Sequence, residues 1–391
     1  MLRSLYSGIS GLRAHQTMLD VTGNNIANVN TTGFKGSSAQ FQDTLSQMTQ
    51  GASGPQAATG GTNPAQVGLG VRVAAVTTTF TQGSAQTTGK ATDMMISGDG
   101  FFVTSRGGQQ YFTRAGSFGL DASGHLVGPD GGILQGWMAD ASGRVNTGSP
   151  TTGLVLSPTA MIPARATTGV EVAGNLPSDA ATGAALQRDI QVFDANGTAR
   201  TLSLSFTRTA GGWNVAATDA SGATGSGSLA FTDGKQTTPG SVSVGGITVD
   251  LGTVTGYAGS TTVAATGQNG WEAGTLEAFS VGADGSLVGS FSNGIRQSVG
   301  QVALARFTNP AGLEKSGQSS YSATANSGNA QVGQAGDSGF GSLVGGALEM
   351  SNVDLSQEFT NLIVAQRGFQ ANARIITTSD QVLQELVDLK R

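Results

Sequence analysis

The chain ends in SNVDLSQEFTNLIVAQRGFQANARIITTSDQVLQELVDLKR, residues 351–391. From Leu355 onward, every third or fourth residue belongs to a heptad seam that is apolar except at Gln366 and Asp380. The seam consists of Leu355, Phe359, Leu362, Gln366, Phe369, Ala373, Ile376, Asp380, Leu383 and Val387. The stretch contains no proline, so it predicts one helix of about 35 residues, roughly 50 Å long, whose apolar side needs a partner.

The start of this helix has its own signal. Asp354, with Gln357 three residues further on, forms a capping-box pattern. Glu358 in the first turn and Lys390 and Arg391 at the end suit the helix dipole. The polar Gln366 on the seam either sets the register between helices or is a tolerated interruption.

A second seam lies at the other end of the chain, where we expect a helix over residues 1–28. Its members are Leu2, Leu5, Ile9, Leu12, Gln16, Leu19, Gly23 and Ile26. The two seams can close on each other within one chain, or other copies can take part. Two facing seams make only a thin core, and further apolar residues lie next to each seam. This excess favours packing against helices from other copies of the chain. These flanking residues are Tyr6, Met18, Ile363, Ile375 and Leu386.

Composition narrows the class of protein. Glycine makes up 61 of the 391 residues, about twice the usual share, and charged residues are 12%, about half the usual share. The net charge of −5 gives no sign of the basic surface that nucleic-acid binding requires. Cysteine is absent, which permits an extracellular location. The N-terminal stretch is amphipathic and contains Arg13 and His15, so we expect neither a cleaved signal peptide nor a membrane span.

Between the termini the apolar period changes to two, which predicts short antiparallel strands. Residues 94–96 and 101–103 read as a strand, a tight turn and a second strand, and Leu202, Leu204 and Phe206 as one face of another strand. Asn196-Gly197 and Asp233-Gly234 are hairpin-turn pairs. Residues 36–70 resemble a linker in which Phe41, Leu45 and Met48 allow a short helix. The glycine-rich part of this linker is either disordered or ordered only against a neighbouring subunit.

These patterns predict a nested chain: mainly β, with α-helical termini that pair as a coiled coil around antiparallel β domains. The helical core is residues 1–28 with 351–391, and linkers are 29–70 and 341–350. An inner β domain combines 71–146 with 271–340, and an outer β domain, a sandwich or barrel, is inserted at 147–270. The strand and turn pattern of 94–138 returns after residue 270, which is why we join the two inner segments.

Catalytic and ligand-binding motifs are missing from the sequence. His15 and His125 have no accompanying nucleophile or base, so each favours a structural or solvated role. The Asp residues in Asp-Gly-type turns fit turn geometry rather than calcium, because no alternating acidic run with a distal Glu is present. No phosphate-binding, zinc-protease or serine-hydrolase motif occurs. We therefore expect no enzyme activity, no cofactor and no metal site.

Four groups of motifs support a family resemblance. They are LDV (19–21), GNNIAN (23–28) and TGFK (32–35); VGLGV (67–71) with residues 93–102; GGALE (345–349) with SNVDL (351–355); and IVAQR (363–367) with FQAN (369–372). The chain resembles the bacterial flagellar axial family of rod and hook proteins, most closely its hook members. The resemblance covers the termini strongly, the inner β segments moderately and residues 147–270 very little.

The resemblance implies a subunit of the flagellar hook, the curved hollow tube between rod and filament that transmits torque as a universal joint. It implies an extracellular homopolymer, export through the flagellar apparatus, assembly under a hook cap, and contacts with rod and hook–filament junction proteins. The implied packing residues are Leu5, Ile9, Leu12, Leu19, Asn24, Asn25, Ile26, Leu355, Phe359, Leu362, Gln366, Phe369, Ile376 and Leu383. We expect both termini to be largely disordered in the free monomer and to fold on assembly.

Two alternatives remain. The first is a distal rod subunit or another axial protein, although a β insertion as long as residues 147–270 is large for one. The second is an unrelated secreted β-rich adhesin, which would bind its ligand as a monomer and keep this activity without residues 351–391.

Overall fold

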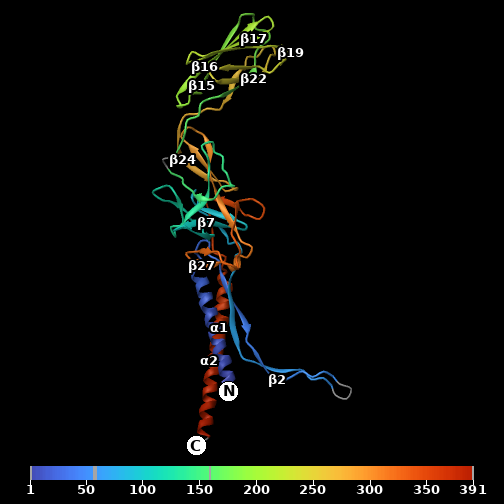
Figure 1. Cartoon of the computed structure of the whole chain (residues 1–391), viewed down its shortest axis with the longest axis vertical. Coiled ribbons are helices and arrows are strands. Elements are labelled where there is room, and N and C mark those ends of the chain that lie inside the picture. Colours follow the sequence, from blue (N-terminus) through green and yellow to red (C-terminus); the bar gives the residue numbers. More distant parts are fainter. Residues whose placement is uncertain (1, 56–59, 158–159, 390–391) are drawn as a thin grey trace. The chain divides into compact units, whose positions relative to one another are not determined.

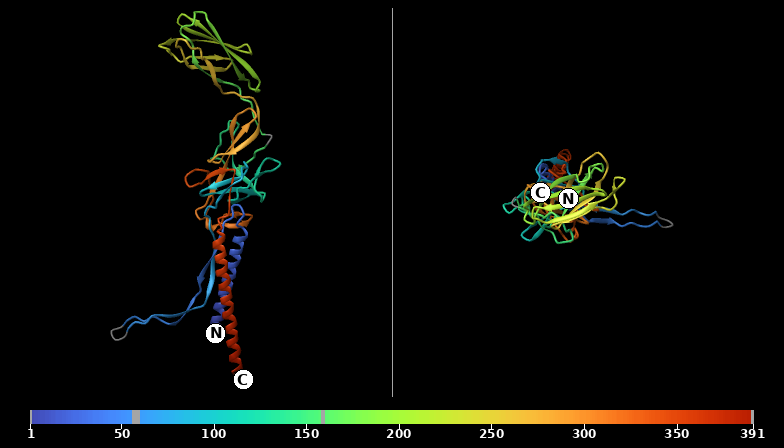
Figure 2. Two further views of the ribbon diagram at one scale, coloured as in Figure 1. Left: turned by 180° about the vertical axis from the view of Figure 1, so that it is seen from behind. Right: turned by 90° about the horizontal axis from the view of Figure 1, so that it is seen from above.

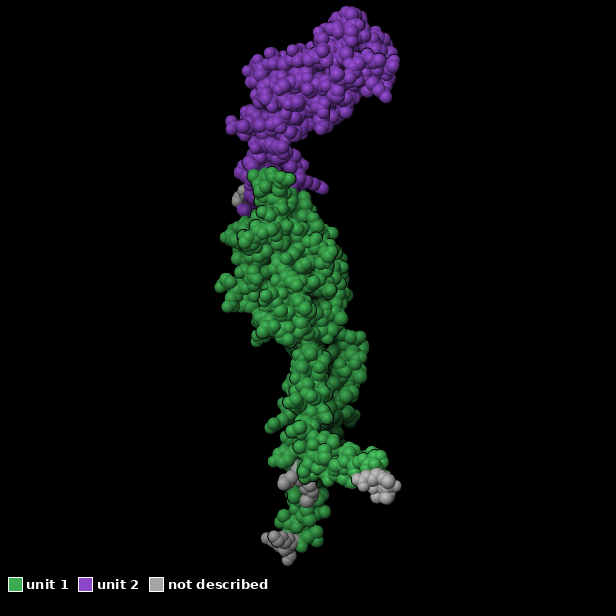
Figure 3. All heavy atoms as spheres, turned by 45° about the vertical axis from the view of Figure 1, so that its right-hand side comes forward, with its two compact units in different colours: residues 1–156, 280–288, 298–391 green, residues 157–279, 289–297 purple. Residues whose placement is uncertain are grey.

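The computed structural model describes residues 2–55, 60–157 and 160–389. The chain divides into two compact units: unit 1 comprises residues 1–156, 280–288 and 298–391, and unit 2 comprises residues 157–279 and 289–297 (Figure 3). Most of the described elements are strands, and the two long helices stand at the termini. The predicted fold class, mainly β with terminal helices that pack together, is confirmed. The finer nested division into four parts stays a prediction.

The terminal helices, α1 (Leu2–Ala27) and α2 (Leu355–Asp388), lie side by side and antiparallel in unit 1 (Figures 1 and 2). Glycines allow their close approach. A Cβ added at Gly11 would lie 2.6 Å from Oδ1 of Asn372, and one at Gly368 would lie 2.5 Å from the His15 ring. On α2 the single buried residue among those described is Ala365, which belongs to the same face as Gly368 and Asn372.

The two helices pair as predicted, but the centre of their contact is rotated from the centre of the α2 seam. A helix turns about 100° per residue, so the face of Ala365, Gly368 and Asn372 is displaced from the seam residues Phe359 and Gln366 by about a quarter turn or more. Small residues occupy the centre of the contact because they let the two backbones approach, and the seam residue Ile376 lies half-buried at its side. The exposed part of the seam, which includes Phe359, has no partner among the described residues of this chain.

The start of α2 is where the sequence predicts it. Asp354 is the N-cap, and its Oδ1 accepts hydrogen bonds from the N–H groups of Ser356 and Gln357 at 2.8 and 3.3 Å. The reciprocal half of the capping box is wrong, because the Gln357 amide donates to Oδ1 of Asn361 at 3.1 Å. The expected dipole partners Lys390 and Arg391 lie outside the described residues.

The two glycines Gly11 and Gly23 of α1 provide a matched test of the helix contact. No atom lies within 4 Å of a Cβ built at Gly23, whereas one at Gly11 meets Asn372. In the polymer, where both terminal helices are folded, we expect Gly23→Ala to raise the helical content measured by circular dichroism, since alanine favours a helix over glycine by about 1 kcal/mol. Gly11→Ala should lose this gain and make α1 more sensitive to protease. Equal gains from both variants would contradict the contact between α1 and α2.

After α1 the chain forms strands where the sequence allowed a short helix. β1 (Ser37–Asp43) pairs antiparallel with β4 (Val71–Thr78), and β2 (Ser46–Gln50) pairs with β3 (Ala65–Gly68). The helix expected around Phe41, Leu45 and Met48 is wrong. β1 finds its partner in β4, which is rich in valine and threonine, and the pair lies along α1. The rings of His15 and Phe41, 5.8 Å apart and edge to face, belong to this contact.

Most of the remaining strands of unit 1 belong to a β sheet that contains the strand order β26–β11–β7–β8–β28–β27, and two further strand pairs form separate two-stranded sheets. The strands of this part are β5 (Ala85–Thr87), β6 (Met94–Ser97), β7 (Phe101–Arg106), β8 (Gln109–Thr113), β9 (Gly119–Leu120), β10 (Leu126–Val127), β11 (Ile133–Met138), β12 (Thr152–Gly153), β26 (Arg296–Arg306), β27 (Glu314–Gly317), β28 (Ser320–Ser322), β29 (Gln331–Gln334), β30 (Ser342–Gly345) and β31 (Ala347–Glu349), with a 3-10 helix at Pro310–Gly312. Phe101, Val103, Phe112, Phe307 and Tyr321 form one of its cores.

The predicted strand, turn and strand around residues 94–103 are present as β6 and β7. They do not pair with each other: β6 pairs with β30, and β7 pairs with β8 and β11. Gly98 and Gly100 between them have φ values of 108° and 133°, a region that L side chains rarely adopt. β31 pairs with β5, so both strands that lead into α2 are held by strands that follow β4 in the chain.

Unit 2 contains two four-stranded sheets, β15–β16–β17–β18 and β21–β22–β14–β23, around one apolar core. Leu202, Leu204 and Phe206 of β16 are each fully buried in it, which confirms the predicted apolar face. The turns at Asn196-Gly197 and Asp233-Gly234 are also confirmed, since β15 pairs with β16 and β19 pairs with β20. The parallel pairing of β14 with β22 was not predicted.

The strands whose bounds lie in or reach into this unit are β13 (Met161–Ile162), β14 (Gly169–Asn175), β15 (Ala185–Phe193), β16 (Ala199–Thr209), β17 (Gly212–Asp219), β18 (Thr224–Leu229), β19 (Phe231–Thr232), β20 (Lys235–Gln236), β21 (Ser241–Val244), β22 (Ile247–Thr255), β23 (Ala264–Gln268), β24 (Gly274–Val281) and β25 (Ser286–Phe291).

Candidate assembly site

The last turn of α1 is tied to the next strand by Asn25. Its Nδ2 donates to the carbonyl of Ser37 at 2.7 Å, and its Oδ1 accepts from the N–H of Ser37 at 3.0 Å. A primary amide has both a donor and an acceptor, so it can pair with a backbone as a strand does. Asn25 is buried, whereas Asn24 is exposed, and both lie within α1 rather than in a turn after it.

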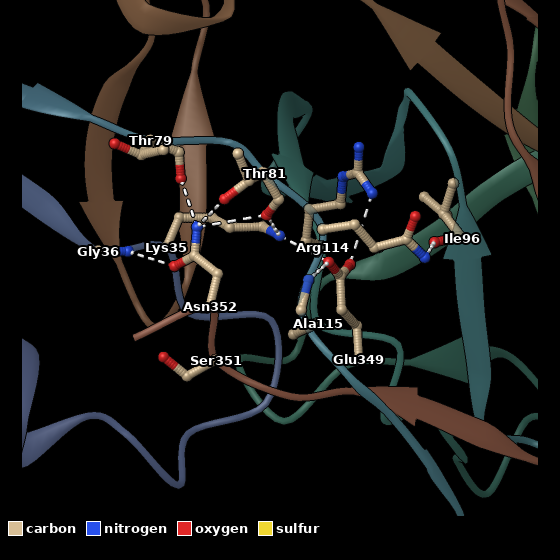
Figure 4. A network of polar contacts seen from close by, with 12 residues as sticks. Lys35, Gly36, Thr79, Thr81, Ile96, Arg114, Ala115, Glu349, Ser351 and Asn352 are labelled. Carbon is tan, nitrogen blue, oxygen red and sulfur yellow. Dashed lines mark hydrogen bonds and ion pairs between the residues drawn. The ribbon is translucent and has the colours of Figure 1, made fainter. Parts of the chain in front are cut away.

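A buried carboxylate then joins segments from three parts of the chain (Figure 4). The Nζ of Lys35 lies 2.6 Å from Oε1 of Glu349, and neither side chain is exposed. An Nη atom of Arg114 lies 3.4 Å from Oε2 of Glu349. The N–H of Gly83 donates to Oε1 at 2.9 Å, and Lys35 also donates to the carbonyl of Thr81 at 2.7 Å. Both oxygens of Glu349 are therefore satisfied, as a buried charge requires.

Asn352 adds a second connection just before α2. Its Oδ1 accepts from the N–H of Gly36 at 2.8 Å, and its Nδ2 donates to the carbonyl of Thr79 at 2.8 Å and to Oγ1 of Thr81 at 2.9 Å. We call Asn25, Lys35, Arg114, Glu349 and Asn352 the polar clamp. The clamp fastens the end of α1 and the approach to α2 to the strands between them.

The electrostatics of the clamp are those of a tightly coupled buried cluster. Burial lowers the pKa of the Lys35 ammonium, against the opposing effect of the adjacent Glu349. Burial also lowers the pKa of the Arg114 guanidinium. Two buried cations thus pair with one carboxylate, and removing it leaves Lys35 without an ion-pair partner and Arg114 with only the weaker interaction with Asp99.

The two helices that the clamp holds carry a large unpaired apolar surface. On α2, Phe359 is 51% exposed, Ile363 56%, Val364 54% and Val387 68%, and Tyr6 on α1 is 66% exposed. The exposed large apolar side chains of α2 and of its C-cap residue, here named the apolar surface of α2, are Leu355, Phe359, Ile363, Val364, Ile375, Val382, Leu383, Leu386, Val387 and Leu389. Such a surface is typical of a protein–protein contact.

The predicted packing residues fall into three groups in the monomer. The half-buried ones are Leu5, Ile9, Leu12, Leu19, Ile26, Leu362, Phe369 and Ile376. The exposed ones are Asn24, Leu355, Phe359, Gln366 and Leu383. Asn25 alone is buried, because it bonds to Ser37 of its own chain. Their role between subunits stays a prediction.

The polar clamp as a unit is not predictable from the sequence. Lys35 and Glu349 each belong to one of the family motifs, but their pairing links residues 314 positions apart. The available signal was their charge, since each is the only charged residue in its motif, TGFK or GGALE. That signal marks unusual residues without saying which of them meet.

The polar turns have the geometry expected from the sequence. Asp121 Oδ1 accepts from the N–H groups of Ser123 and His125, and Asp284 Oδ1 accepts from that of Ser286. The hydrogen bond from the backbone of His125 lowers the pKa of Asp121. The His125 ring lies against the same carboxylate, with Nδ1 3.2 Å from Oδ2.

In the described ranges no three His, Cys, Asp or Glu residues gather as metal ligands would. Over the same ranges no helix combines the length and apolarity needed to span a bilayer.

Three protein-family models match the chain. They are the flagella basal body rod protein model at residues 5–35, the D1 domain of the flagellar hook protein FlgE/F/G at 95–175, and the C-terminal model of the flagellar basal body rod FlgEFG protein at 344–389. The first and last models contain the clamp residues Asn25, Lys35, Glu349 and Asn352.

Curated relatives match the whole length. The flagellar hook protein FlgE of Borreliella burgdorferi is 42% identical, covering 100% of both chains, and that of Salmonella typhimurium is 35% identical, covering 99% of this chain and 100% of its own. The flagellar basal-body rod protein FlgG of Bacillus subtilis is 34% identical over 100% of both. The crystal structure of Helicobacter pylori flagellar hook protein FlgE2 matches with a TM-score of 0.50 at 13% identity, covering 66% of this chain and 98% of that one.

Paired terminal helices with an unpaired apolar surface, joined to a mainly β body, are typical of a protein that assembles through contacts with other protein chains. The chain belongs to the FlgE/F/G family of flagellar hook and rod proteins. The resemblance inferred from its terminal motifs is confirmed.

Proposed function

We propose that this chain is the subunit of a flagellar hook, which polymerises into a curved hollow tube that joins rod to filament and transmits torque while it bends. One observation carries the proposal: α2 leaves Phe359 and Val387 more than half exposed at 51% and 68%, in a chain related over its full length to proteins named hook protein. Covering this apolar area by neighbouring copies stabilises a polymer by about 25 cal/mol per Å².

The packing residues inferred from the sequence belong to the same proposal. Residues that lie half-buried beside the α1–α2 contact, such as Leu362 and Phe369, would complete their burial against neighbouring helices. Fully exposed ones, such as Phe359 and Leu383, would insert between other copies. The polar Gln366 would set the register among them.

The remaining partners follow from this role. We expect contacts with rod and hook–filament junction proteins at the two ends of the tube, a hook cap during growth, and the flagellar export apparatus before it. The protein would work outside the cell as a structural element without catalysis. Export without a cleaved signal peptide stays a prediction.

A distal rod subunit is the alternative, supported by the full-length similarity to the rod protein FlgG. Electron microscopy of the purified chain, polymerised on its own, separates the two functions. A hook subunit should form supercoiled or curved tubes, and straight rods would favour the alternative. A chain that stays monomeric at every concentration, with its helices folded, would overturn both.

Most of unit 2 can be deleted without separating the two chain segments that flank it. Arg165 and Trp271 form an antiparallel bridge in which each N–H donates to the carbonyl of the other, at 2.9 and 3.0 Å. Residues 166–270 can therefore be replaced by an Asn-Gly turn without separating the ends. We expect the shortened chain to polymerise, with tubes whose curvature or bending stiffness in electron micrographs differs clearly from the full chain. Complete loss of polymer would contradict the assignment of assembly to the terminal helices.

A further inference from the structure

Arg114, a buried cation of the polar clamp, has fewer partners than its chemistry requires. Its side chain is only 3% exposed, and a guanidinium carries several N–H donors that burial separates from water. Among the described residues it donates one long hydrogen bond, 3.4 Å to Oε2 of Glu349, and its Nε is buried without an acceptor. Its Cζ lies 5.4 Å from the centre of the Phe101 ring, a contact that supplies no oxygen acceptor. Figure 4 shows one nitrogen of Arg114 directed toward Glu349 and another directed away from it.

The same guanidinium lines a pocket in unit 1. The pocket has a volume of about 410 Å³, and its apolar lining consists mainly of Phe80, Phe101, Phe307 and Pro310. Phe101 and Phe307 are buried residues of the β core, so the rings beside Arg114 are held in place by the fold. An apolar pocket with a few charged groups is typical of a ligand-binding site.

The charges around the pocket favour a further negative group. Glu349 is shared between Arg114 and Lys35, so the buried cluster holds two cations and one carboxylate. A third cation, Arg306, also lines the pocket. Asp99 in the lining is exposed, and its charge raises the pKa of Arg114, but the two form no ion pair within the described part of the chain.

We propose that this pocket binds a carboxylate attached to a small apolar group. The carboxylate would accept hydrogen bonds from the unpartnered N–H groups of Arg114, because a planar carboxylate matches the geometry of a guanidinium. The apolar group would lie against Phe80, Phe307 and Pro310. A phosphate dianion would fit less well, since Asp99 in the same lining repels it more strongly than a monoanion. The carboxylate can belong to a free small molecule or to an acidic side chain of another copy, and the experiment distinguishes these sources.

Sodium benzoate is the probe, and neutral benzamide, which has nearly the same shape, is its control. Titration calorimetry on the purified full-length monomer should show one benzoate bound per chain, with a Kd of about 1 mM or tighter, and no binding of benzamide. Asp99→Asn should tighten the binding of benzoate about fivefold, because it removes a like charge from the lining. Asp99 is exposed, so this variant should keep the fold.

Arg114→Gln should abolish the binding of benzoate in a chain whose circular dichroism shows intact β structure. A wild-type monomer that binds no benzoate, or a folded Arg114→Gln chain that binds it as well as the wild type, would overturn the proposal. If Arg114→Gln does not fold, the comparison of Asp99→Asn with the wild type decides, and equal affinities would overturn it.

Polymerised chains separate the two sources of the carboxylate. If an acidic side chain of another copy fills the pocket, the polymer should bind no benzoate, and benzoate should raise the critical concentration for polymerisation. If the natural ligand is a free carboxylate, the polymer should bind benzoate as the monomer does. The monomer titration does not depend on the proposed hook function, so a chain that forms no polymer would overturn that function and leave the pocket assignment intact.

Discussion

A chain carrying Phe359→Asp together with Ile363→Asp should remain monomeric under conditions in which the wild type polymerises. Both side chains are more than half exposed in the isolated chain, at 51% and 56%. In a polymer that buries them, two carboxylates would be desolvated without partners, which costs several kcal/mol. Even about 3 kcal/mol per contact raises the critical concentration roughly 100-fold. Sedimentation and electron microscopy would measure the loss.

The control for this experiment is Phe359→Leu together with Ile363→Leu. Leucine keeps both exposed positions apolar and favours a helix at least as well as the residues it replaces. This variant changes the same two side chains without adding charge, and should polymerise close to the wild-type concentration. Near-UV and far-UV circular dichroism should show that the β units of all variants are intact. Normal assembly of the double variant would place the apolar surface of α2 outside the subunit contacts.

Replacing Glu349 with Gln should be the most damaging single change to the folded monomer. It leaves Lys35, which is fully buried, and Arg114, which is 3% exposed, without their carboxylate. Breaking a buried ion pair by removing one partner typically costs about 3–5 kcal/mol, and here two cations lose theirs. Denaturant unfolding of the monomer would show a lower midpoint for the β part of unit 1, because Lys35, Arg114 and Glu349 join its segments.

Two further variants test whether the loss of the buried carboxylate causes this destabilisation. Lys35→Met should cost less than Glu349→Gln, because Glu349 keeps Arg114 at 3.4 Å and the Gly83 N–H at 2.9 Å. Glu314→Gln removes an exposed carboxylate from the same unit and should stay within about 0.5 kcal/mol of the wild type. Equal stability of Glu349→Gln and Glu314→Gln would mean that the clamp does not hold the structure together.

Much of the fold was predictable because the local spacing of apolar residues indicates helices and strands. Spacings of three and four located α1 and α2, Asp354 marked the start of α2, and alternation marked β16 with its buried Leu202, Leu204 and Phe206. Asn-Gly and Asp-Gly pairs located hairpins, since those turns need positive φ. The error around Phe41, Leu45 and Met48 has the same origin: a short stretch with mixed spacing took its conformation from the ladder between β1 and β4.

The candidate site was predictable only in part. Its apolar residues follow from the seams, and the family follows from motifs at residues 19–35 and 345–372. The sequence could not say which side of α2 would face α1, because Gly8, Gly11 and Gly368 make a closer contact than the larger seam residues. That choice depends on the fit of two surfaces in space, and it leaves the large residues free for other copies.

The amino-acid order alone therefore established the type of each long element and the flagellar hook and rod family, since both depend on residues that are close together in the chain. Folding in three dimensions brought Lys35 against Glu349 and Arg114, paired β6 with β30 and β5 with β31, and left the end of α2 uncovered. These contacts join distant segments, so no local pattern encodes which residues meet.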